Sequence, residues 1–120
     1  MYLFDSSAII EILKGNSAVL ERYSDQTLLC INLVYGEVYY YCLKANIAIG
    51  DFRKIQFEMI EYTIEDIQHA MELLYERKRR IKDFSFIDAL VYTIAVKNKL
   101  TLVTKDFGFK GLSQVEFIAC

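Results

Sequence analysis

The sequence of 120 residues contains no proline, no tryptophan and only one histidine, His69. A single histidine leaves almost no material for a histidine-rich zinc site or for a Ser-His-Asp triad. The longest uncharged run, from Gln26 to Gly36, is well short of the roughly 20 apolar residues that cross a bilayer. The sequence therefore argues against a zinc enzyme, a serine hydrolase and a membrane-spanning protein.

The three cysteines, Cys30, Cys42 and Cys120, show no paired spacing. Cys30 and Cys42 lie in apolar runs, so we interpret them as small core side chains. An odd number of cysteines without a motif favours a reducing compartment, and we expect a cytoplasmic protein. The first residues carry no basic segment of the kind that begins a secretory signal, which agrees with that expectation.

The length favours a single domain over residues 1–120. Hydrophobic residues make up 54% of the chain, above the about 45–50% of typical soluble domains. A dimer or partner interface is expected to cover part of this surplus. The net charge of −2 provides no overall attraction to nucleic acid, so any such contact needs a local basic patch.

The pattern of apolar residues predicts strands that alternate with helices. The expected strands are 2–4, 27–31, 59–63, 100–104 and 115–118. The expected helices run from about Ser6 to Gly15, over 18–23, over 33–45 with Asn32 as cap, from Gly50, from Thr63 to about Arg80, and from Ser85 to about Lys97. This order predicts an α/β fold with a central parallel sheet of four to five strands flanked by helices.

Two acidic residues occur where stability alone would not place them. Glu37 is the only charge between Leu33 and Leu43, and its helical neighbours are apolar or aromatic. Asp88 has similar neighbours. A carboxylate on such a face is desolvated unless something pairs with it. Each acid also has a purely structural explanation. Glu37 could form a buried salt bridge, and Asp88 could form a capping box with Ser85.

Two further acids directly follow predicted strands. Asp5 comes after the first strand and Asp106 after the strand that ends at Thr104. Ligands of parallel sheets bind at the carboxyl ends of strands. Both acids also have a structural explanation: Asp5 could be a plain helix N-cap, and Asp106 could be a turn residue. If all four acids converge, their repulsion calls for a divalent cation, and ligation by oxygen alone favours Mg²⁺ or Mn²⁺.

Four segments together resemble the PIN domain family, and most closely its VapC-like toxins. They are Phe4-Asp5-Ser6-Ser7, Ile31-Asn32-Leu33-Val34-Tyr35-Gly36-Glu37-Val38, Ser85-Phe86-Ile87-Asp88-Ala89-Leu90 and Leu102-Val103-Thr104-Lys105-Asp106-Phe107. Each segment alone is a weak signal, but their order and spacing cover essentially the whole chain.

The resemblance implies a PIN-like fold and a Mg²⁺- or Mn²⁺-dependent endoribonuclease, the toxin of a toxin–antitoxin pair. It implies an RNA substrate, inhibition by an antitoxin protein and a homodimer. The acidic positions fall on Asp5, Glu37, Asp88 and Asp106, as catalytic and metal-binding residues. Ser6 and Thr104 match hydroxyl positions that support them.

A basic cluster, Arg77, Lys78, Arg79 and Arg80, followed by Lys82, is a candidate RNA contact. Its structural alternative is a solvated helix end, where cations complement the helix dipole. Three consecutive side chains on a helix, such as those of Tyr39-Tyr40-Tyr41, point in different directions, so at most one or two of them could stack on RNA bases. Packing in the core or in an interface is therefore the favoured interpretation.

Three other functions remain open from the sequence. A phosphoacceptor signalling domain of this size needs a lone Asp at the end of its central strand, and the predicted strand over 59–63 ends without one. A PIN-like binding module without catalysis fits less well, since all four acids are present. A PIN nuclease in RNA maturation is the closest competitor.

Overall fold

The computed structural model describes residues 1–47 and 49–118. Cys120 lies outside the described residues. The strands are β1 (Tyr2–Phe4), β2 (Leu28–Cys30), β3 (Phe57–Met59), β4 (Thr101–Thr104) and β5 (Val115–Phe117). The helices are α1 (Ser6–Leu13), α2 (Ser17–Tyr23), α3 (Asn32–Lys44), α4 (Ile49–Arg53), α5 (Ile64–Lys78) and α6 (Phe86–Lys97), with a short 3₁₀ turn η1 (Phe107–Phe109). The α/β fold predicted from the sequence is confirmed.

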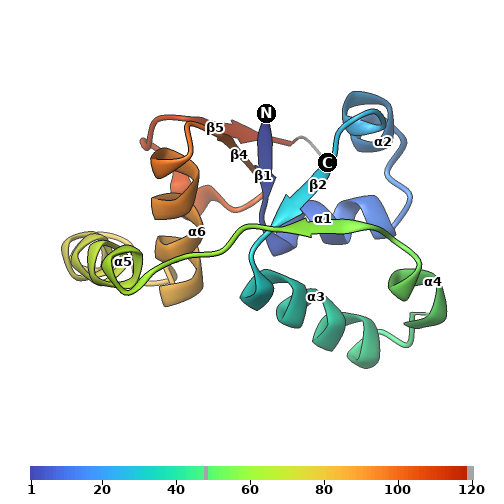
Figure 1. Cartoon of the computed structure of the whole chain (residues 1–120), viewed down its shortest axis with the longest axis horizontal. Coiled ribbons are helices and arrows are strands. Elements are labelled where there is room, and N and C mark those ends of the chain that lie inside the picture. The colour runs from blue at the N-terminus through green and yellow to red at the C-terminus, as the bar shows by residue number, and fades with distance from the viewer. Residues whose placement is uncertain (48, 119–120) are drawn as a thin grey trace.

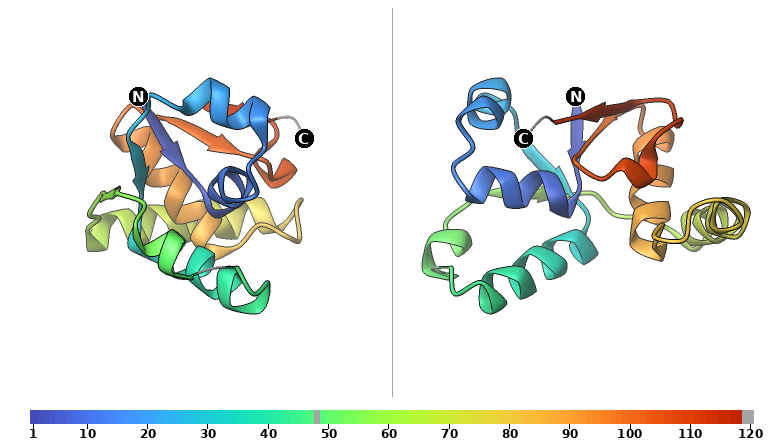
Figure 2. Two further views of the ribbon diagram at one scale, coloured as in Figure 1. Left: turned by 90° about the vertical axis from the view of Figure 1, so that its right-hand side faces the viewer. Right: turned by 180° about the vertical axis from the view of Figure 1, so that it is seen from behind.

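The five strands form one parallel sheet in the order β3-β2-β1-β4-β5. The chain moves outward from β1 to β3 and then returns past β1 to place β4 on its other side. Parallel crossovers are right-handed, so this reversal puts helices on opposite faces of the sheet. Helices α1 and α3 pack together on one side, and α5 and α6 on the other (Figure 1, Figure 2).

The core lies between these layers and is built around the central strands. Leu3, Phe4, Leu102 and Val103, on the paired strands β1 and β4, are fully buried. Strands that are covered on both faces read as continuous apolar runs, which explains why these two were clear in the sequence. Cys30 and Cys42 are also buried and are free thiols, as their apolar surroundings predicted.

Local sequence signals set the helix starts. Thr63 with Asp66, and Ser85 with Asp88, form complete capping boxes, with both the hydroxyl and the carboxylate bonded to backbone N–H groups. Asn32 is not the cap that the sequence suggested. Helix α3 begins at Asn32 itself after Ile31, and the Asn32 Oδ1 instead accepts a hydrogen bond of 3.0 Å from the Tyr62 hydroxyl.

The third strand also differs from its expected range of 59–63. It covers Phe57–Met59, beside β2, at the edge of the sheet. Its pattern misled the prediction because Glu58 and Met59 are both exposed, whereas Ile60 packs on the core from the following loop. Edge strands lack the burial on both faces that makes central strands recognisable.

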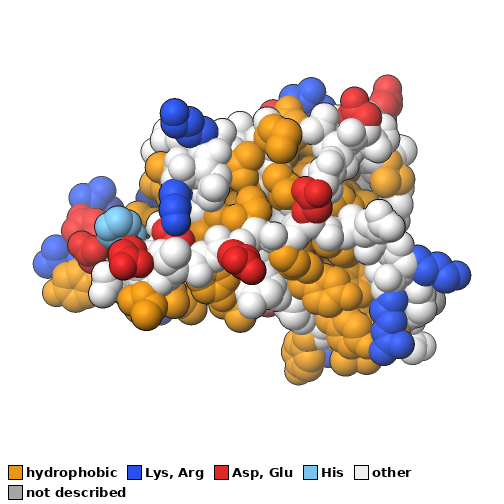
Figure 3. All heavy atoms as spheres, in the orientation of Figure 1, with side chains coloured by type: hydrophobic (Ala, Val, Ile, Leu, Met, Phe, Trp, Pro, Cys, Tyr) orange, Lys and Arg blue, Asp and Glu red, His pale blue; other side chains and the backbone are white. Residues whose placement is uncertain are grey.

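The surface separates charged from apolar regions. Charged side chains of both signs gather over α5, whereas hydrophobic ones cover much of the surface over α3 and α4 (Figure 3). On α3, Tyr40 is 62% and Leu43 is 58% exposed, while Tyr39 packs against the core. His69 is exposed. None of the described helices is long and apolar enough to cross a membrane.

Candidate active site

The reversal of chain direction between β1 and β4 marks the place where a ligand is expected. In open α/β sheets, ligands bind beyond the carboxyl ends of the strands at such a switch point. Asp5 directly follows β1, and Asp106 lies two residues beyond β4. The two strand ends are tied together, since the backbone N–H of Asp5 donates to the Val103 carbonyl at 3.2 Å.

Asp5 is buried, with 5% of its surface exposed, and caps helix α1. Its Oδ1 accepts hydrogen bonds from the Ser7 hydroxyl at 2.7 Å and from the Ala8 N–H at 3.0 Å. Its Oδ2 accepts a hydrogen bond from the Thr104 hydroxyl. Burial raises the pKa of Asp5 to about 6, although these donors oppose the shift. Asp5 is therefore the N-cap of α1, and beyond this role it is buried and bonded to the end of β4 through Thr104.

Asp88 is the third residue of α6 and is half-buried. Its Oδ2 accepts a hydrogen bond of 2.9 Å from the Ser85 N–H, which completes the capping box. Burial raises the pKa of Asp88, and the charge of Asp106 raises it further. Asp106 itself caps η1, where its Oδ1 accepts a hydrogen bond of 2.8 Å from the Gly108 N–H. The structural interpretations of Asp88 and Asp106 are therefore correct, but they engage one oxygen of each carboxylate.

Glu37 lies on α3, on a more open face than its apolar neighbours suggested. The buried stripe of this helix is Val34, Val38 and Cys42, and Glu37 is an exposed residue. Burial nevertheless raises the pKa of its carboxyl group, against a hydrogen bond from Ser6, and the charge of Asp88 adds to the rise. Glu37 has no salt bridge within the described part of the chain.

The four acids interact electrostatically through Asp88. The charge of Asp88 raises the pKa of both Asp5 and Glu37, and the charge of Asp106 raises that of Asp88. In residues 1–47 and 49–118, no three His, Cys, Asp or Glu side chains are arranged to hold a metal ion. The donor set itself suits a hard divalent cation, because all four groups offer oxygen and repel one another.

Hydroxyl groups contact the acids, and the hydrogen bond from Ser6 lowers the pKa of Glu37. Thr104 is buried and connects two acids: its hydroxyl donates to Asp5 and accepts from the Asp106 N–H at 2.9 Å. Ser7, which the sequence did not single out, makes the second side-chain contact to Asp5. Ser7 stands two residues after an N-cap Asp, and this short local spacing was the available signal.

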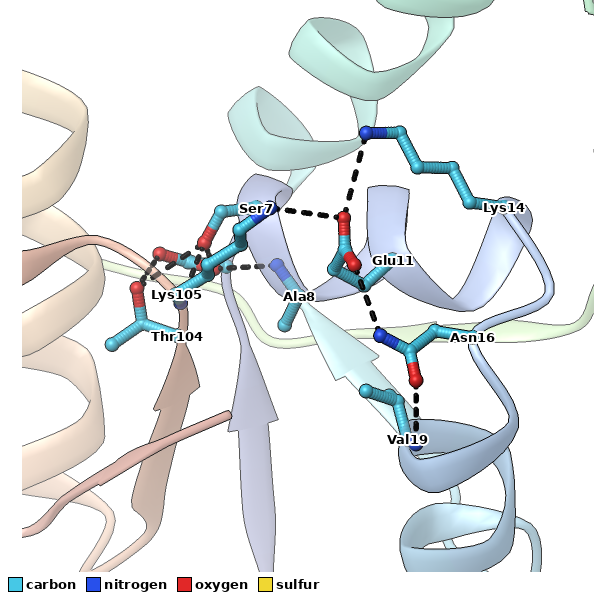
Figure 4. Close-up of polar contacts among 9 residues, drawn as sticks. Ser7, Ala8, Glu11, Lys14, Asn16, Val19, Thr104 and Lys105 are labelled. Carbon is cyan, nitrogen blue, oxygen red and sulfur yellow. Dashed lines mark hydrogen bonds and ion pairs between the residues drawn. The ribbon is translucent and has the colours of Figure 1, made fainter. Parts of the chain in front are cut away.

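Glu11 is a fifth acid that the sequence did not indicate. It is 5% exposed on α1, and its Oε2 lies 3.2 Å from the Lys105 Nζ and 3.5 Å from the Lys14 Nζ (Figure 4). Its Oε1 accepts a hydrogen bond of 3.1 Å from the Asn16 side-chain amide. Lys105 is 94 residues away in sequence, so no local pattern could reveal this contact.

The basic cluster divides into one anchored residue and several exposed ones. The Arg77 guanidinium donates to the Gly108 carbonyl at 3.0 and 2.7 Å and to the Lys110 carbonyl at 2.7 Å. Arg77 therefore holds the turn that Asp106 caps. Lys78, Arg79 and Arg80 are exposed. Their contact with RNA remains a prediction.

Several solved structures share this fold. A toxin–antitoxin complex from Klebsiella pneumoniae contains a chain that matches with a TM-score of 0.79 and 18% identity, over 97% of this chain and 96% of that chain. VapBC2 from Rickettsia felis, bound to a promoter DNA fragment, matches with a TM-score of 0.73 and 20% identity, over 98% of both chains. VapC20 from Mycobacterium tuberculosis, described as a sarcin–ricin loop cleaving toxin, matches with a TM-score of 0.72 and 17% identity, over 94% of this chain and 95% of that chain.

At these levels of identity, the likeness shows a shared fold. The sequence has no significant match among curated proteins. The model of one family, the PIN domain, matches residues 2–114, which is nearly the whole chain. With its five-stranded parallel sheet and its near-complete match to that model, the chain belongs to the PIN domain family.

Proposed function

We propose that this PIN domain is a Mg²⁺- or Mn²⁺-dependent endoribonuclease that acts as the toxin of a toxin–antitoxin pair. The observation that carries the proposal is the PIN domain match over residues 2–114, together with Asp5 and Asp106 beyond the carboxyl ends of β1 and β4, at the switch point of the sheet. The charge of Asp88, which raises the pKa of Asp5 and of Glu37, supports it. Carboxyl groups with raised pKa values are costly for the fold at neutral pH. A bound cation would offset that cost.

Asp5, Glu37, Asp88 and Asp106 are the residues that would hold the metal. When bound, a divalent ion supplies an activated water and stabilises negative charge on a phosphodiester. Thr104 and Ser7 orient Asp5, and the turn fixed by Arg77 carries Asp106. Asp5, whose pKa is about 6, must lose its proton before it binds a cation. No side chain is required to act as a nucleophile.

The first test compares single-residue variants in an RNA cleavage assay with Mg²⁺. Asp5→Asn and Asp88→Asn are expected to abolish cleavage, while circular dichroism shows that both remain folded. Glu72→Gln, an exposed acid on α5, is the matched control and should keep wild-type activity. A folded Asp5→Asn or Asp88→Asn variant with undiminished cleavage would refute the assignment.

The partner in this proposal is an antitoxin protein, and its supports are the toxin–antitoxin complexes among the structures with this fold. We also propose a homodimer, because Tyr40 and Leu43 leave apolar surface exposed on α3. Expression of the chain alone should arrest growth, and co-expression with the neighbouring reading frame should restore it and yield a complex. RNA cleavage without growth arrest would instead favour a PIN nuclease in RNA maturation. Light scattering on the purified chain tests the dimer.

A further inference from the structure

The 3₁₀ turn η1 carries an exposed aromatic side chain directly after one of the four acids. Phe107 follows Asp106 in the chain, and 75% of its surface is exposed. Single exposed hydrophobic residues are common on proteins, so exposure alone says little. The position of this ring and the way in which it is held are what make it informative.

Phe107 stacks on Phe117 of β5, the strand beside β4 (Figure 1). The two ring centroids lie 5.7 Å apart, and the ring planes are 28° from parallel. Because Phe117 pairs in register with Thr104, their two side chains leave the sheet on the same face. The Thr104 hydroxyl donates to Asp5. The aromatic pair formed by Phe107 and Phe117 therefore lies at the carboxyl end of the sheet, next to the candidate active site.

The main chain around Phe107 is fixed on both sides of the ring. The Gly108 N–H donates to the Asp106 Oδ1 at 2.8 Å, and the Gly108 carbonyl accepts hydrogen bonds of 3.0 and 2.7 Å from the Arg77 guanidinium. The carbonyl of Phe107 itself accepts a hydrogen bond of 2.9 Å from the Lys110 N–H. The ring therefore needs little ordering when it binds a flat ligand, which lowers the entropic cost of binding.

A fixed and exposed ring beside the four acids suits a nucleobase. The bases of single-stranded RNA stack on aromatic side chains, and every base offers a flat face for this contact. The acids repel the phosphates of RNA, and the net charge of −2 provides no overall attraction to them. Base stacking on an uncharged ring would supply binding energy that does not depend on charge.

The competing interpretation is that the aromatic pair docks a protein. Protein docking sites are contiguous apolar patches, whereas over residues 105–118 the exposed large hydrophobic side chains are Phe107 and Phe117. Exposed residues of the same segment include Lys110, Ser113 and Gln114. The broader apolar surface lies over α3 and α4 (Figure 3). A pair of rings among polar residues matches the size of one base better than that of a partner helix.

We propose that Phe107, supported by Phe117, stacks on a base of the RNA next to the phosphodiester that is cleaved. This inference rests on the ribonuclease function proposed above. Phe107 is then a substrate-binding residue, and Phe117 is a positioning residue that acts only through the Phe107 ring. The contact favours single-stranded RNA, since the bases of a duplex are stacked on one another and offer no free face.

The first test measures cleavage of a labelled single-stranded RNA. Phe107→Ala should raise KM about tenfold with kcat changed less than about twofold, as expected for the loss of one stacked base outside the reacting bond. Phe107→Tyr keeps a flat ring and should match the wild type, whereas Phe107→Leu is apolar without a ring and should resemble Phe107→Ala. Val96→Ala, at an exposed apolar position near the end of α6, is the matched control and should match the wild type.

The absence of tryptophan from the sequence provides a direct probe of stacking. Phe107→Trp introduces a single indole, whose fluorescence RNA should quench. Val96→Trp, eight residues along α6 from Asp88, is the control and should not be quenched. An oligomer of the same length that has the ribose and phosphate groups but no bases should quench neither variant. These titrations use the Asp88→Asn background, in which the RNA is expected to stay intact.

The role of Phe117 is tested by a double-mutant cycle. Phe117→Ala should raise KM, and Phe117→Ala combined with Phe107→Ala should be no worse than Phe107→Ala alone. Phe117→Tyr keeps the ring and should restore the KM of the wild type. If the effects of the two alanine substitutions on KM simply add, Phe117 does not act through Phe107 and its assignment is wrong.

The outcomes separate the stacking contact from the ribonuclease function. If the wild type cleaves RNA while Phe107→Ala leaves KM unchanged, the contact is wrong and the ribonuclease function stands. If Phe107→Leu performs as well as Phe107→Tyr, or if the oligomer without bases quenches the indole equally, no base is stacked there. If Phe107→Ala keeps its KM but no longer co-purifies with the product of the neighbouring reading frame, the pair docks a protein and the inference is wrong.

Two further results complete the test. Because Phe107 is largely exposed, its alanine variant is expected to fold, as circular dichroism would show. If it does not fold, the comparison of Phe107→Tyr with Phe107→Leu decides. If the wild type neither binds nor cleaves RNA, both proposals are wrong.

Discussion

Asp5→Asn should make the metal-free protein more stable at neutral pH. Asp5 is 5% exposed, and burial raises its pKa to about 6 from an ordinary value of 3.8. At about 1.4 kcal/mol per pH unit, keeping this carboxylate ionised in the folded state costs about 3 kcal/mol. Between pH 3.8 and about 6 the folded state holds a proton that the unfolded state has released, so stability falls as pH rises through this window.

An asparagine removes this cost because it is neutral at every pH. Its carbonyl oxygen can still accept the hydrogen bonds that Ser7 and Ala8 donate to Oδ1 of Asp5. The amide nitrogen would meet the Thr104 hydroxyl, which now donates to Asp5, so part of the gain is lost. We expect a net gain of about 1–3 kcal/mol at about pH 8 and almost none near pH 4, where the wild-type carboxyl is protonated in the folded state.

The assay is urea unfolding followed by circular dichroism, in EDTA, at both pH values. Asp25→Asn, at an exposed position after α2, is the matched control and should leave the unfolding free energy unchanged. An Asp5→Asn variant that is no more stable than the wild type at the higher pH would refute the reasoning. So would a gain of equal size at both pH values, because it would not come from ionisation. With Mg²⁺ added, the wild type should gain more stability than the variant.

Three further predictions concern the surroundings of the site. Arg77→Met removes the hydrogen bonds to the carbonyls of Gly108 and Lys110 and should cost about 1–3 kcal/mol in urea unfolding. Arg79→Met, at an exposed position, should stay within about 0.5 kcal/mol of the wild type, and equal losses would contradict the anchoring role of Arg77. Ser85→Ala removes the hydroxyl half of the capping box of α6 and should cost about 1 kcal/mol, and an unchanged melting temperature would count against the box. At Mg²⁺ concentrations well below saturation, the rate of RNA cleavage should fall as pH drops below about 6, because a proton and the cation compete for Asp5. A flat profile from about pH 5 to 8 under these conditions would contradict this.

The parts of the fold that follow from local sequence were predictable. The capping boxes at Thr63 and Ser85 each need four consecutive residues, and both are complete in the structure. The central strands β1 and β4 were clear because they are apolar on both faces. The edge strand β3 was placed about two residues too late, since its exposed residues give no signal and the apolar Ile60 follows it.

The candidate site was only partly predictable, because local sequence patterns locate strand ends but do not show contacts between distant parts of the chain. Asp5 and Asp106 could be located by the ends of their strands, which the sequence predicts well. Of the contacts that orient Asp5, Thr104 was named from the family resemblance although it lies 99 residues away, whereas Ser7 was missed because the choice between Ser6 and Ser7 depends on helix geometry. Glu11 was missed since its partner Lys105 comes from the other end of the chain.

The different ways in which Asp5 and Asp88 are built into the fold have a genetic consequence. Asp88 starts helix α6 through its bond to Ser85, so a substitution that leaves no side-chain oxygen to accept this bond, such as Asp88→Ala, should weaken the helix and lower the amount of protein. Asp5→Asn keeps an oxygen for the hydrogen bonds from Ser7 and Ala8 and removes a charge that is costly at neutral pH, so this variant should accumulate. In a selection for cells that survive this protein, inactive forms that persist and still bind the partner should therefore include Asp5→Asn, whereas Asp88→Ala should be recovered as a poorly accumulating chain.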